Sequence, residues 1–386
     1  MPLNNPDRLL ATNENHLDLA REIYDQIENL PIISPHGHCD PNWFSENQRF
    51  PDPANLFVVP DHYVLRMLVS QGSTLSELGV NPIDGSNFEK DPKEIWRKFS
   101  ENYYLFRGTP TAMWLDYSFE KVFGITEPLT AGTSEFYYNH IEEKLSQPEY
   151  LPQALFDRFN IEVLSTTDPA ISDLSQHIEI KNSNWDGRII PTYRPDSVID
   201  PERCDFKNNL VKLGELANQD INSWDGYLKA HRSRRLFFKE MGATATDHGH
   251  PSARTENLSY TDAEQLYNRI LAEDFNSEDA DKFRGQMLTE MAKMSCEDGL
   301  VMQIHPGSRR NHSNKIFNQF GLDKGFDIPG ATDYVSALKP LLDEVGLRND
   351  LTIILFTLDE TSYSRELAPL AGVYPALKLG PPWWFF

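Results

Sequence analysis

Residues 299–307, GLVMQIHPG, and residues 351–359, LTIILFTLD, decide the fold of this chain. Each is a short apolar run that ends in polar residues, and helical apolar spacing fills the stretches between such runs. The same pattern recurs at residues 31–36, 161–168, 188–196, 242–249 and 374–384. Short apolar strands that alternate with helices indicate βα units around a parallel sheet. Neither GxGxxG nor a P-loop motif occurs, so the sequence favours a (β/α) barrel over a nucleotide-binding fold.

Polar residues end these runs, and in a barrel of this kind the chemistry gathers at the C-terminal ends of the strands. The residues at the expected strand ends are His36, His38, Asp168, Arg194, Asp247, His248, His305 and Asp359. The sequence therefore predicts a functional site built from several of these side chains.

The chain divides into three parts. Residues 1–41 hold an amphipathic helix over 16–30 and a first barrel strand, in which residues 32–33 are expected to be buried. Residues 42–152 are rich in aromatic helical segments separated by proline and glycine, which is typical of a helical insertion after the first strand. Residues 153–386 hold the remaining strands, two to seven.

The charge balance excludes two classes of partner. The 386 residues include 36 Lys plus Arg against 58 Asp plus Glu, a formal net charge of −22. A surface this acidic repels phosphate backbones and anionic lipid, so we expect no nucleic-acid and no membrane partner. The N-terminus lacks a signal pattern and no stretch reaches the roughly 18 apolar residues of a membrane span, which predicts a cytoplasmic protein.

His36-Gly37-His38 is the sharpest local motif in the sequence. In an extended segment, side chains two residues apart lie on the same face, so both imidazoles can bind one metal ion. Imidazole suits zinc and similar divalent ions, and a ligand pair at a strand end leaves coordination positions open. The alternative is chance, because a second such pair occurs at His248 and His250, where we expect a loop or capping role for His250.

Asp61-His62-Tyr63, followed by Arg66, stands at an expected helix start. His62 and Arg66 share one face of that helix, which suits an acid/base group and an anion contact carried on a lid. The alternative is structural: Asp61 caps the helix while His62 and Arg66 face solvent.

Arg194 and His305 end two later strands. Arg194 can grip a carboxylate through two nitrogens, and the alternative is an ion pair with Asp196 or Asp200. His305 can serve as a metal ligand or a proton-transfer group, and the alternative is a hydrogen-bonded core histidine.

Taken together, these motifs resemble those of a known family. In order, SPHGHCDP, VPDHYVLRML, LSTTDP, PTYRPD, TDHGH, QIHPGSRRNHSN and GPPWWF are similar to uronate isomerase (glucuronate isomerase), of the amidohydrolase superfamily, from about Asn5 to Phe386. The resemblance implies a (β/α)8 TIM-type barrel of the metal-dependent hydrolase type. It implies interconversion of D-glucuronate with D-fructuronate and of D-galacturonate with D-tagaturonate, with a hexuronate as substrate and a divalent metal, usually zinc. A homo-oligomer is left open.

The resemblance also assigns residues. The family's site positions fall on His36 and His38 for the metal, His62 and Tyr63 for substrate contact, Arg194 for the uronate, His305 for the strand-5 position where hydrolytic relatives place a ligand, and Trp383 and Trp384 for the pocket wall. Arg66 is a further place where an anionic sugar can be held. The family continues to an eighth strand that carries an Asp and an Arg, and we expect this last βα unit to be missing from the chain.

The expected reaction proceeds by proton abstraction at C2, an enediolate, and reprotonation at C1. His62 and Tyr63 are expected to transfer the proton, and Arg194 to contribute to a clamp on the distal carboxylate. The metal is expected to orient or polarise substrate hydroxyl groups. Two alternatives stay open: a metal-dependent hydrolase of the same superfamily, and an inactive truncated product.

Overall fold

The computed structural model describes residues 3–382. The strands are β1 (Ile32–Ser34), β2 (Ile161–Ser165), β3 (Asp168–Pro169), β4 (Ile189–Ile190), β5 (Tyr193–Arg194), β6 (Ala245–His248), β7 (Val301–Ile304), β8 (Ser308–Arg309), β9 (Ile328–Pro329), β10 (Ile353–Leu355) and β11 (Leu377–Leu379). Among these residues no helix is both long enough and apolar enough to cross a membrane.

The strands form parallel sheets whose order follows the sequence. The hydrogen-bonded orders are β1-β2-β4 and β11-β10-β7-β6-β5-β3, and β8 pairs with β9 in an antiparallel ribbon. The two parallel groups are continuous, because β2 and β3 belong to one segment, and β4 and β5 to the next. Between these two segments, Thr166 N donates to Ile190 O at 2.9 Å and Asp168 N donates to Thr192 O at 3.0 Å. The expected strand segments are therefore present in an α/β fold.

The closed barrel is not confirmed by the strand order. β1 and β11 lie at opposite ends of that order, and within residues 3–382 no strand pairing joins them. The structure shows an open succession of parallel strands with helices between them, in which the first and last strands are edges.

The central strands are buried beneath helices. β6 is buried along its whole length, as are Met302 and Ile304 of β7 and the two ends of β10. The helices that follow the strands are α9 (Ser175–Asn182), α10 (Asp196–Ile199), α11 (Phe206–Ala217), α12 (Trp224–Glu240), α13 (Tyr260–Leu271), α14 (Ser277–Asp298), α16 (Tyr334–Ala337), α17 (Lys339–Val345), α18 (Glu360–Ser362) and α19 (Ala368–Val373). Burial of this kind explains why these strands are continuous apolar runs in the sequence.

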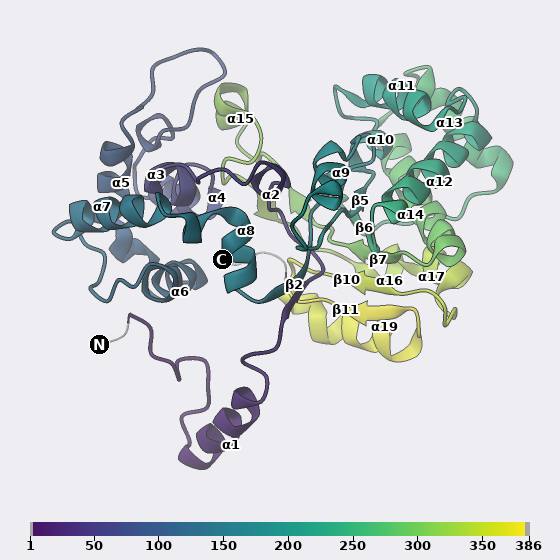
Figure 1. The fold of residues 1–386 in the computed structure, drawn as a ribbon. Coiled ribbons are helices and arrows are strands. Elements are labelled where there is room, and N and C mark those ends of the chain that lie inside the picture. The colour runs from purple at the N-terminus through teal and green to yellow at the C-terminus, as the bar shows by residue number, and fades with distance from the viewer. Residues whose placement is uncertain (1–2, 383–386) are drawn as a thin grey trace.

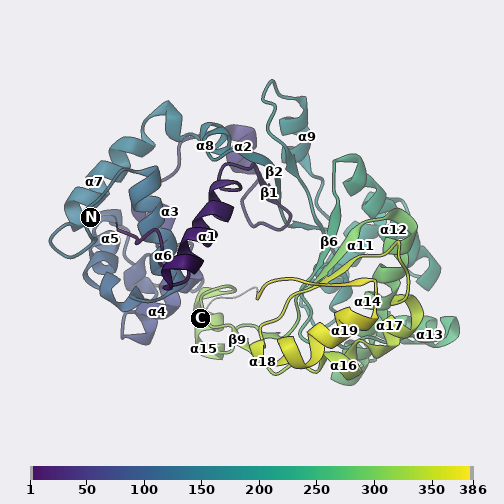
Figure 2. The same cartoon turned by 90° about the horizontal axis from the view of Figure 1, so that it is seen from below.

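A second core lies among the early helices. These are α2 (Asn42–Glu46), α3 (Pro53–Phe57), α4 (His62–Ser70), α5 (Pro92–Glu101), α6 (Pro110–Tyr117), α7 (Ser134–Leu145) and α8 (Pro152–Arg158). Figures 1 and 2 show α3 to α7 as one lobe and the strands with α11 to α14 as the other. Asp52, Asp91 and Thr109 cap α3, α5 and α6, and a proline follows each cap. These helix starts are therefore encoded locally.

Helix α15 (Asn314–Phe320) comes late in the chain but packs with the early helices. Phe320 is 7% exposed and belongs to the second core, and Ile316 packs against the same core. The segment between β8 and β9 therefore links the two lobes.

The N-terminal segment differs from the expectation. The predicted helix is present as α1 (Glu14–Asp25), but none of its residues is buried, and Figure 1 shows it apart from both lobes. The expectation of a buried first strand is wrong, because Ile32 and Ile33 are 49% and 62% exposed. The reason is that β1 is an end strand, so it lacks the cover that a central strand has on both sides.

Replacing Phe320 by alanine tests the contact between the lobes. We expect Phe320→Ala to lower the free energy of unfolding by about 3–4 kcal/mol, because it leaves a cavity in a buried aromatic core. Phe317→Ala is the matched control, since Phe317 lies on the same helix and is 40% exposed. Urea unfolding measures both variants, and equal losses would contradict the packing described.

Candidate functional site

Side chains from several strand ends meet around Asp247. His36 follows β1, Arg194 ends β5, Asp247 lies in β6 and His305 follows β7. Ligand atoms of His36, Asp247 and His305 all lie within 4.8 Å of one another. Because parallel strands end at the same edge of a sheet, residues far apart in the sequence converge there.

Asp247 is the centre of this cluster and is fully buried. Its Oδ1 lies 2.5 Å from His305 Nε2 and 3.7 Å from His36 Nδ1, and its Oδ2 lies 3.4 Å from Arg194 Nη1. Burial alone would raise the pKa of Asp247, but these neighbours outweigh burial and hold the pKa below its ordinary value. Asp247 is therefore a carboxylate at neutral pH. From the sequence, Asp247 was predicted only as one of several strand-end residues, within the TDHGH segment.

His36 and His38 bring their Nε2 atoms within 3.3 Å of each other. Gln303 Oε1 lies 3.1 Å from His36 Nδ1, so Nδ1 donates and the Nε2 lone pair is left for a ligand. Burial lowers the pKa of both imidazoles, that of His38 to about 4, which keeps both neutral at pH 7. Two nitrogens on one tetrahedral zinc ion, each about 2.1 Å from it, would lie about 3.4 Å apart. The pair therefore fits one divalent metal ion.

The backbone of this histidine motif is held by its neighbours. Gln303 Nε2 donates to Pro35 O at 3.1 Å, and Thr167 Oγ1 donates to Gly37 O at 2.9 Å. A Cβ on Gly37 would lie 2.7 Å from Ser165 O, so only glycine allows this close approach. Gln303 was missed in the sequence, because glutamine beside His305 carries no motif of its own.

Arg194 is an ion-pair partner as well as a strand-end cation. Its Nε donates to Asp196 Oδ2 at 2.7 Å, so the ion-pair alternative is present, whereas Asp200 pairs with Arg284 at 2.5 Å. Burial would lower the pKa of Arg194, but Asp196 and Asp247 outweigh burial and raise it. The guanidinium is therefore a fixed positive charge with 24% of its side chain exposed.

His62, Tyr63 and Arg66 lie on α4. Asp61 caps this helix, because its Oδ1 accepts from Tyr63 N at 2.8 Å and Val64 N at 3.2 Å. The capping alternative is therefore present, although His62 and Arg66 are half-buried and do not face open solvent.

A small pocket joins α4 to the loop before β9. It is lined by His62, Tyr63, Arg66, Gly325 and Asp327. Burial lowers the pKa of His62 and raises the pKa of Tyr63 to about 12, so at neutral pH His62 is uncharged and Tyr63 keeps its proton. Gly325 has a φ of +82°, and a Cβ there would lie 2.7 Å from His62 O. Glycine is thus required for the loop to lie against α4.

The remaining strand-end residues have other partners. Asp168 accepts a hydrogen bond from Thr166 Oγ1 at 2.7 Å, and that hydroxyl lies 2.8 Å from His177 Nε2. Asp359 caps α18. Trp383 and Trp384, expected at the pocket wall, lie outside the described residues.

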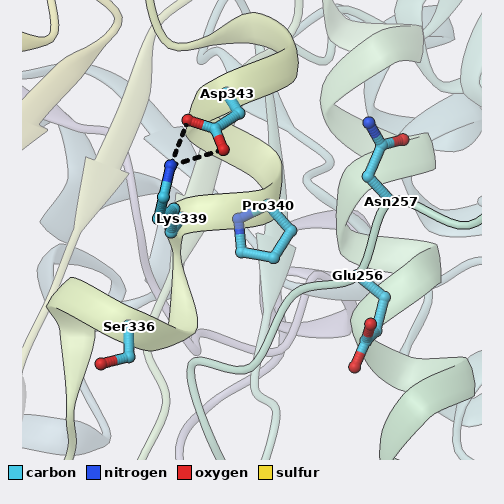
Figure 3. Close-up of a pocket in the computed structure, with 6 residues that line it drawn as sticks. All are labelled: Glu256, Asn257, Ser336, Lys339, Pro340 and Asp343. Atoms are coloured by element: carbon cyan, nitrogen blue, oxygen red, sulfur yellow. Dashed lines mark hydrogen bonds and ion pairs between the residues drawn. The ribbon is translucent and has the colours of Figure 1, made fainter.

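A surface hollow lies between α17 and the loop before α13 (Figure 3). It is lined by Glu256, Asn257, Ser336, Lys339, Pro340 and Asp343. Lys339 Nζ already bonds both oxygens of Asp343, at 2.8 and 2.6 Å. None of the predicted site residues lines this hollow, so we assign it no role in the chemistry.

Comparison with known proteins points to one family. A family model described as glucuronate isomerase matches residues 5–386. The uronate isomerase of Rhizobium meliloti (strain 1021) is 58% identical over 380 residues, which are 98% of this chain and 81% of that protein. The crystal structure of glucuronate isomerase from Caulobacter crescentus has a TM-score of 0.96 at 51% identity and covers 100% of this chain and 80% of that one.

A more distant structure has the same fold. The uronate isomerase of Thermotoga maritima has a TM-score of 0.89 at 27% identity, over 98% of this chain and 81% of that one. The family match extends to residue 386, and the expected loss of the last βα unit is not borne out by it.

Asp168 makes stability depend on pH. Burial raises the pKa of Asp168 from its ordinary value of about 4 to about 6, so the fold favours the neutral acid. That stabilisation is complete below about pH 4 and is lost as the pH rises through 6. We expect wild type to lose about 2 kcal/mol relative to Asp168→Asn between pH 4 and pH 7. Urea unfolding at both pH values checks this, with exposed Asp274→Asn as control; a difference that does not change with pH would refute it.

Proposed function

Because the chain belongs to the glucuronate isomerase family, we propose that it interconverts D-glucuronate with D-fructuronate and D-galacturonate with D-tagaturonate. The observation that carries the proposal is the buried Asp247 carboxylate, which holds His305 and Arg194 beside the His36 and His38 pair. Aldose–ketose isomerisation needs a clamp for the distal carboxylate, groups for proton transfer and stabilisation of an oxyanion. The chain offers a candidate for each of these tasks.

The metal site of the proposed enzyme is made by His36 and His38. Zinc suits two neutral imidazoles, and such an ion supplies Lewis-acid polarisation of a substrate oxygen when bound. Gln303 fixes the tautomer of His36, and the Asp247 carboxylate adds negative charge beside the pair. These contacts hold the two Nε2 atoms ready before any substrate arrives.

The substrate carboxylate is held by arginine. Asp196 and Asp247 orient the Arg194 guanidinium, whose exposed part can bond a uronate carboxylate. Arg66 supplies a second positive charge beside His62 and Tyr63. His305, fixed by Asp247, binds a substrate hydroxyl group.

Proton transfer is assigned to α4. His62 is neutral at pH 7, so it can accept the proton from C2 and later return it to C1. Tyr63 keeps its proton up to about pH 12, so it donates a hydrogen bond to the oxyanion of the enediolate. The two side chains are adjacent, with ring centroids 4.3 Å apart.

Four broader features complete the proposal. The fold is that of a (β/α)8 TIM-type barrel. The divisions at residues 41 and 152 separate the first barrel strand, the helical insertion and the remaining barrel units. We place the protein in the cytoplasm, and its formal net charge of −22 supports the absence of nucleic-acid and membrane partners. The proposal also includes assembly of the chain into a homo-oligomer.

The activity is tested by incubating the purified chain and zinc with D-glucuronate or D-galacturonate. We expect the corresponding ketoses, with deuterium at C2 of the substrate lost at least partly to water because a proton is transferred. Complete retention of that deuterium at C1 would contradict the enediolate route. Hydrolysis of uronate esters or lactones without turnover of free uronates would overturn the isomerase.

Removing the Tyr63 hydroxyl should impair the chemical step. We expect Tyr63→Phe to lower kcat by about 100-fold or more while KM changes little, since the hydrogen bond strengthens in the transition state. Tyr104→Phe is the control, because Tyr104 is 64% exposed in the same lobe. Steady-state kinetics measure kcat and KM of both variants. An unchanged kcat in Tyr63→Phe would exclude Tyr63 as the hydrogen-bond donor to the oxyanion.

Removing the Gln303 amide should weaken metal binding. Gln303→Leu lets His36 rotate and change tautomer, so we expect the zinc dissociation constant to rise about 10- to 100-fold. Gln71→Leu changes an exposed glutamine and should leave the constant unaltered. Competition with a chelating dye measures both, and wild-type affinity in Gln303→Leu would show that Gln303 does not orient the ligand.

A further inference from the structure

A second group of histidine and aspartate side chains lies beside β6. Ligand atoms of Asp196, His248 and His250 all lie within 4.8 Å of one another. His248 ends β6, His250 follows two residues later, and Asp196 begins α10. His250, for which a loop or capping role was expected, lies outside the helices and strands, and its side chain is only 5% exposed. His248 is fully buried.

This group is separate from the cluster at His36 and His38. Asp247 and His248 are neighbours in a strand, so their side chains point to opposite faces. Asp247 faces His36 and His305. His248 Nε2 instead lies 2.9 Å from the hydroxyl of Thr246, two residues earlier on its own face of the strand.

Two buried imidazole nitrogens in this group lack a hydrogen-bond partner within residues 3–382. They are His248 Nδ1 and His250 Nε2. Buried polar atoms in proteins are almost always partnered by protein, water or an ion. Thr246 holds His248 through its other ring nitrogen, which is how the unligated nitrogen of a metal-binding histidine is usually fixed.

Asp196 supplies negative charge to the group. Its Oδ2 accepts from Arg194 Nε at 2.7 Å, and Gly249 N donates to its Oδ1 and Oδ2 at 3.2 and 3.1 Å. Each carboxylate oxygen has two lone pairs, so these bonds orient the carboxylate and still leave it able to bind an ion. Two imidazoles with one carboxylate suit divalent first-row metals.

We propose that Asp196, His248 and His250 form a second metal site, which binds a divalent ion such as zinc or cobalt. The proposal does not rest on the isomerase activity proposed above, although one ligand of the site, Asp196, also orients Arg194. The bound ion links the start of α10 to the end of β6. Because Asp196 also bonds Arg194 Nε, the ion helps to fix the position of that guanidinium.

Metal counting on the full chain tests the site. Protein stripped with a chelator is loaded with zinc, desalted and assayed by mass spectrometry for metal per chain. We expect about two ions in wild type and about one in the double variant His36→Ala/His38→Ala, because the second site keeps its ligands. His250→Gln should also retain about one, and His16→Ala, which changes an exposed histidine, should retain both.

Cobalt gives a readout that does not depend on counting. The visible absorption of cobalt in the double variant should report histidine and carboxylate ligands, and His250→Gln in that background should abolish it. Zinc should raise the Tm of the double variant, and this rise should also disappear with His250→Gln. A double variant that binds no metal, or a His250→Gln protein with the wild-type metal content, would overturn the second site.

Discussion

The buried charge of Asp247 is the constraint on which the arrangement of the strand ends depends. An ionised carboxylate inside a protein is stable only where opposite charges and hydrogen-bond donors surround it. Here those groups are Arg194 and His305, and the neutral imidazole of His36 lies 3.7 Å away. The three side chains come from the ends of three different strands. The end of β6 and the ends of β1, β5 and β7 therefore meet at one place. His36, the Arg194 guanidinium and the His305 imidazole are therefore grouped around one buried charge.

The segment between β8 and β9 connects the two lobes. Phe320 enters the core of the helical lobe, while Gly325 lies against the backbone of His62. Arg310 and Asp327, at 2.9 Å, tie the two ends of the segment together. The helix that carries His62 and Tyr63 is thus packed against chain that continues directly from the strand of His305, so the two sets of site residues are mechanically connected.

Much of this could be predicted from local sequence patterns, because those patterns report local physics. The spacing of His36 and His38, the cap at Asp61 and the succession of apolar runs each depend on a few neighbouring residues. The central place of Asp247 could not be predicted in this way, since it depends on which side chains meet from distant strands. The exposure of residues 32–33 was mispredicted for a related reason: an apolar strand has the same sequence at the edge of a sheet as at its centre. Closure of the sheet into a barrel likewise depends on whether the first and last strands pair. The spacing of apolar residues along the chain does not report that pairing.

The contact between His36 and Gln303 also has a consequence for how the protein is made. The two residues are 267 positions apart in the chain, so the amide that orients the first imidazole is synthesised long after it. At about 5–20 residues per second on the ribosome, the histidine pair waits roughly 15–50 seconds for its glutamine. During that interval the nascent chain exposes two metal-binding imidazoles without the contact that selects their tautomer. A metal ion bound at that time would be held by imidazoles that Gln303 does not yet orient. Correct metal binding therefore occurs in the last stage of folding, after β7 has joined the sheet.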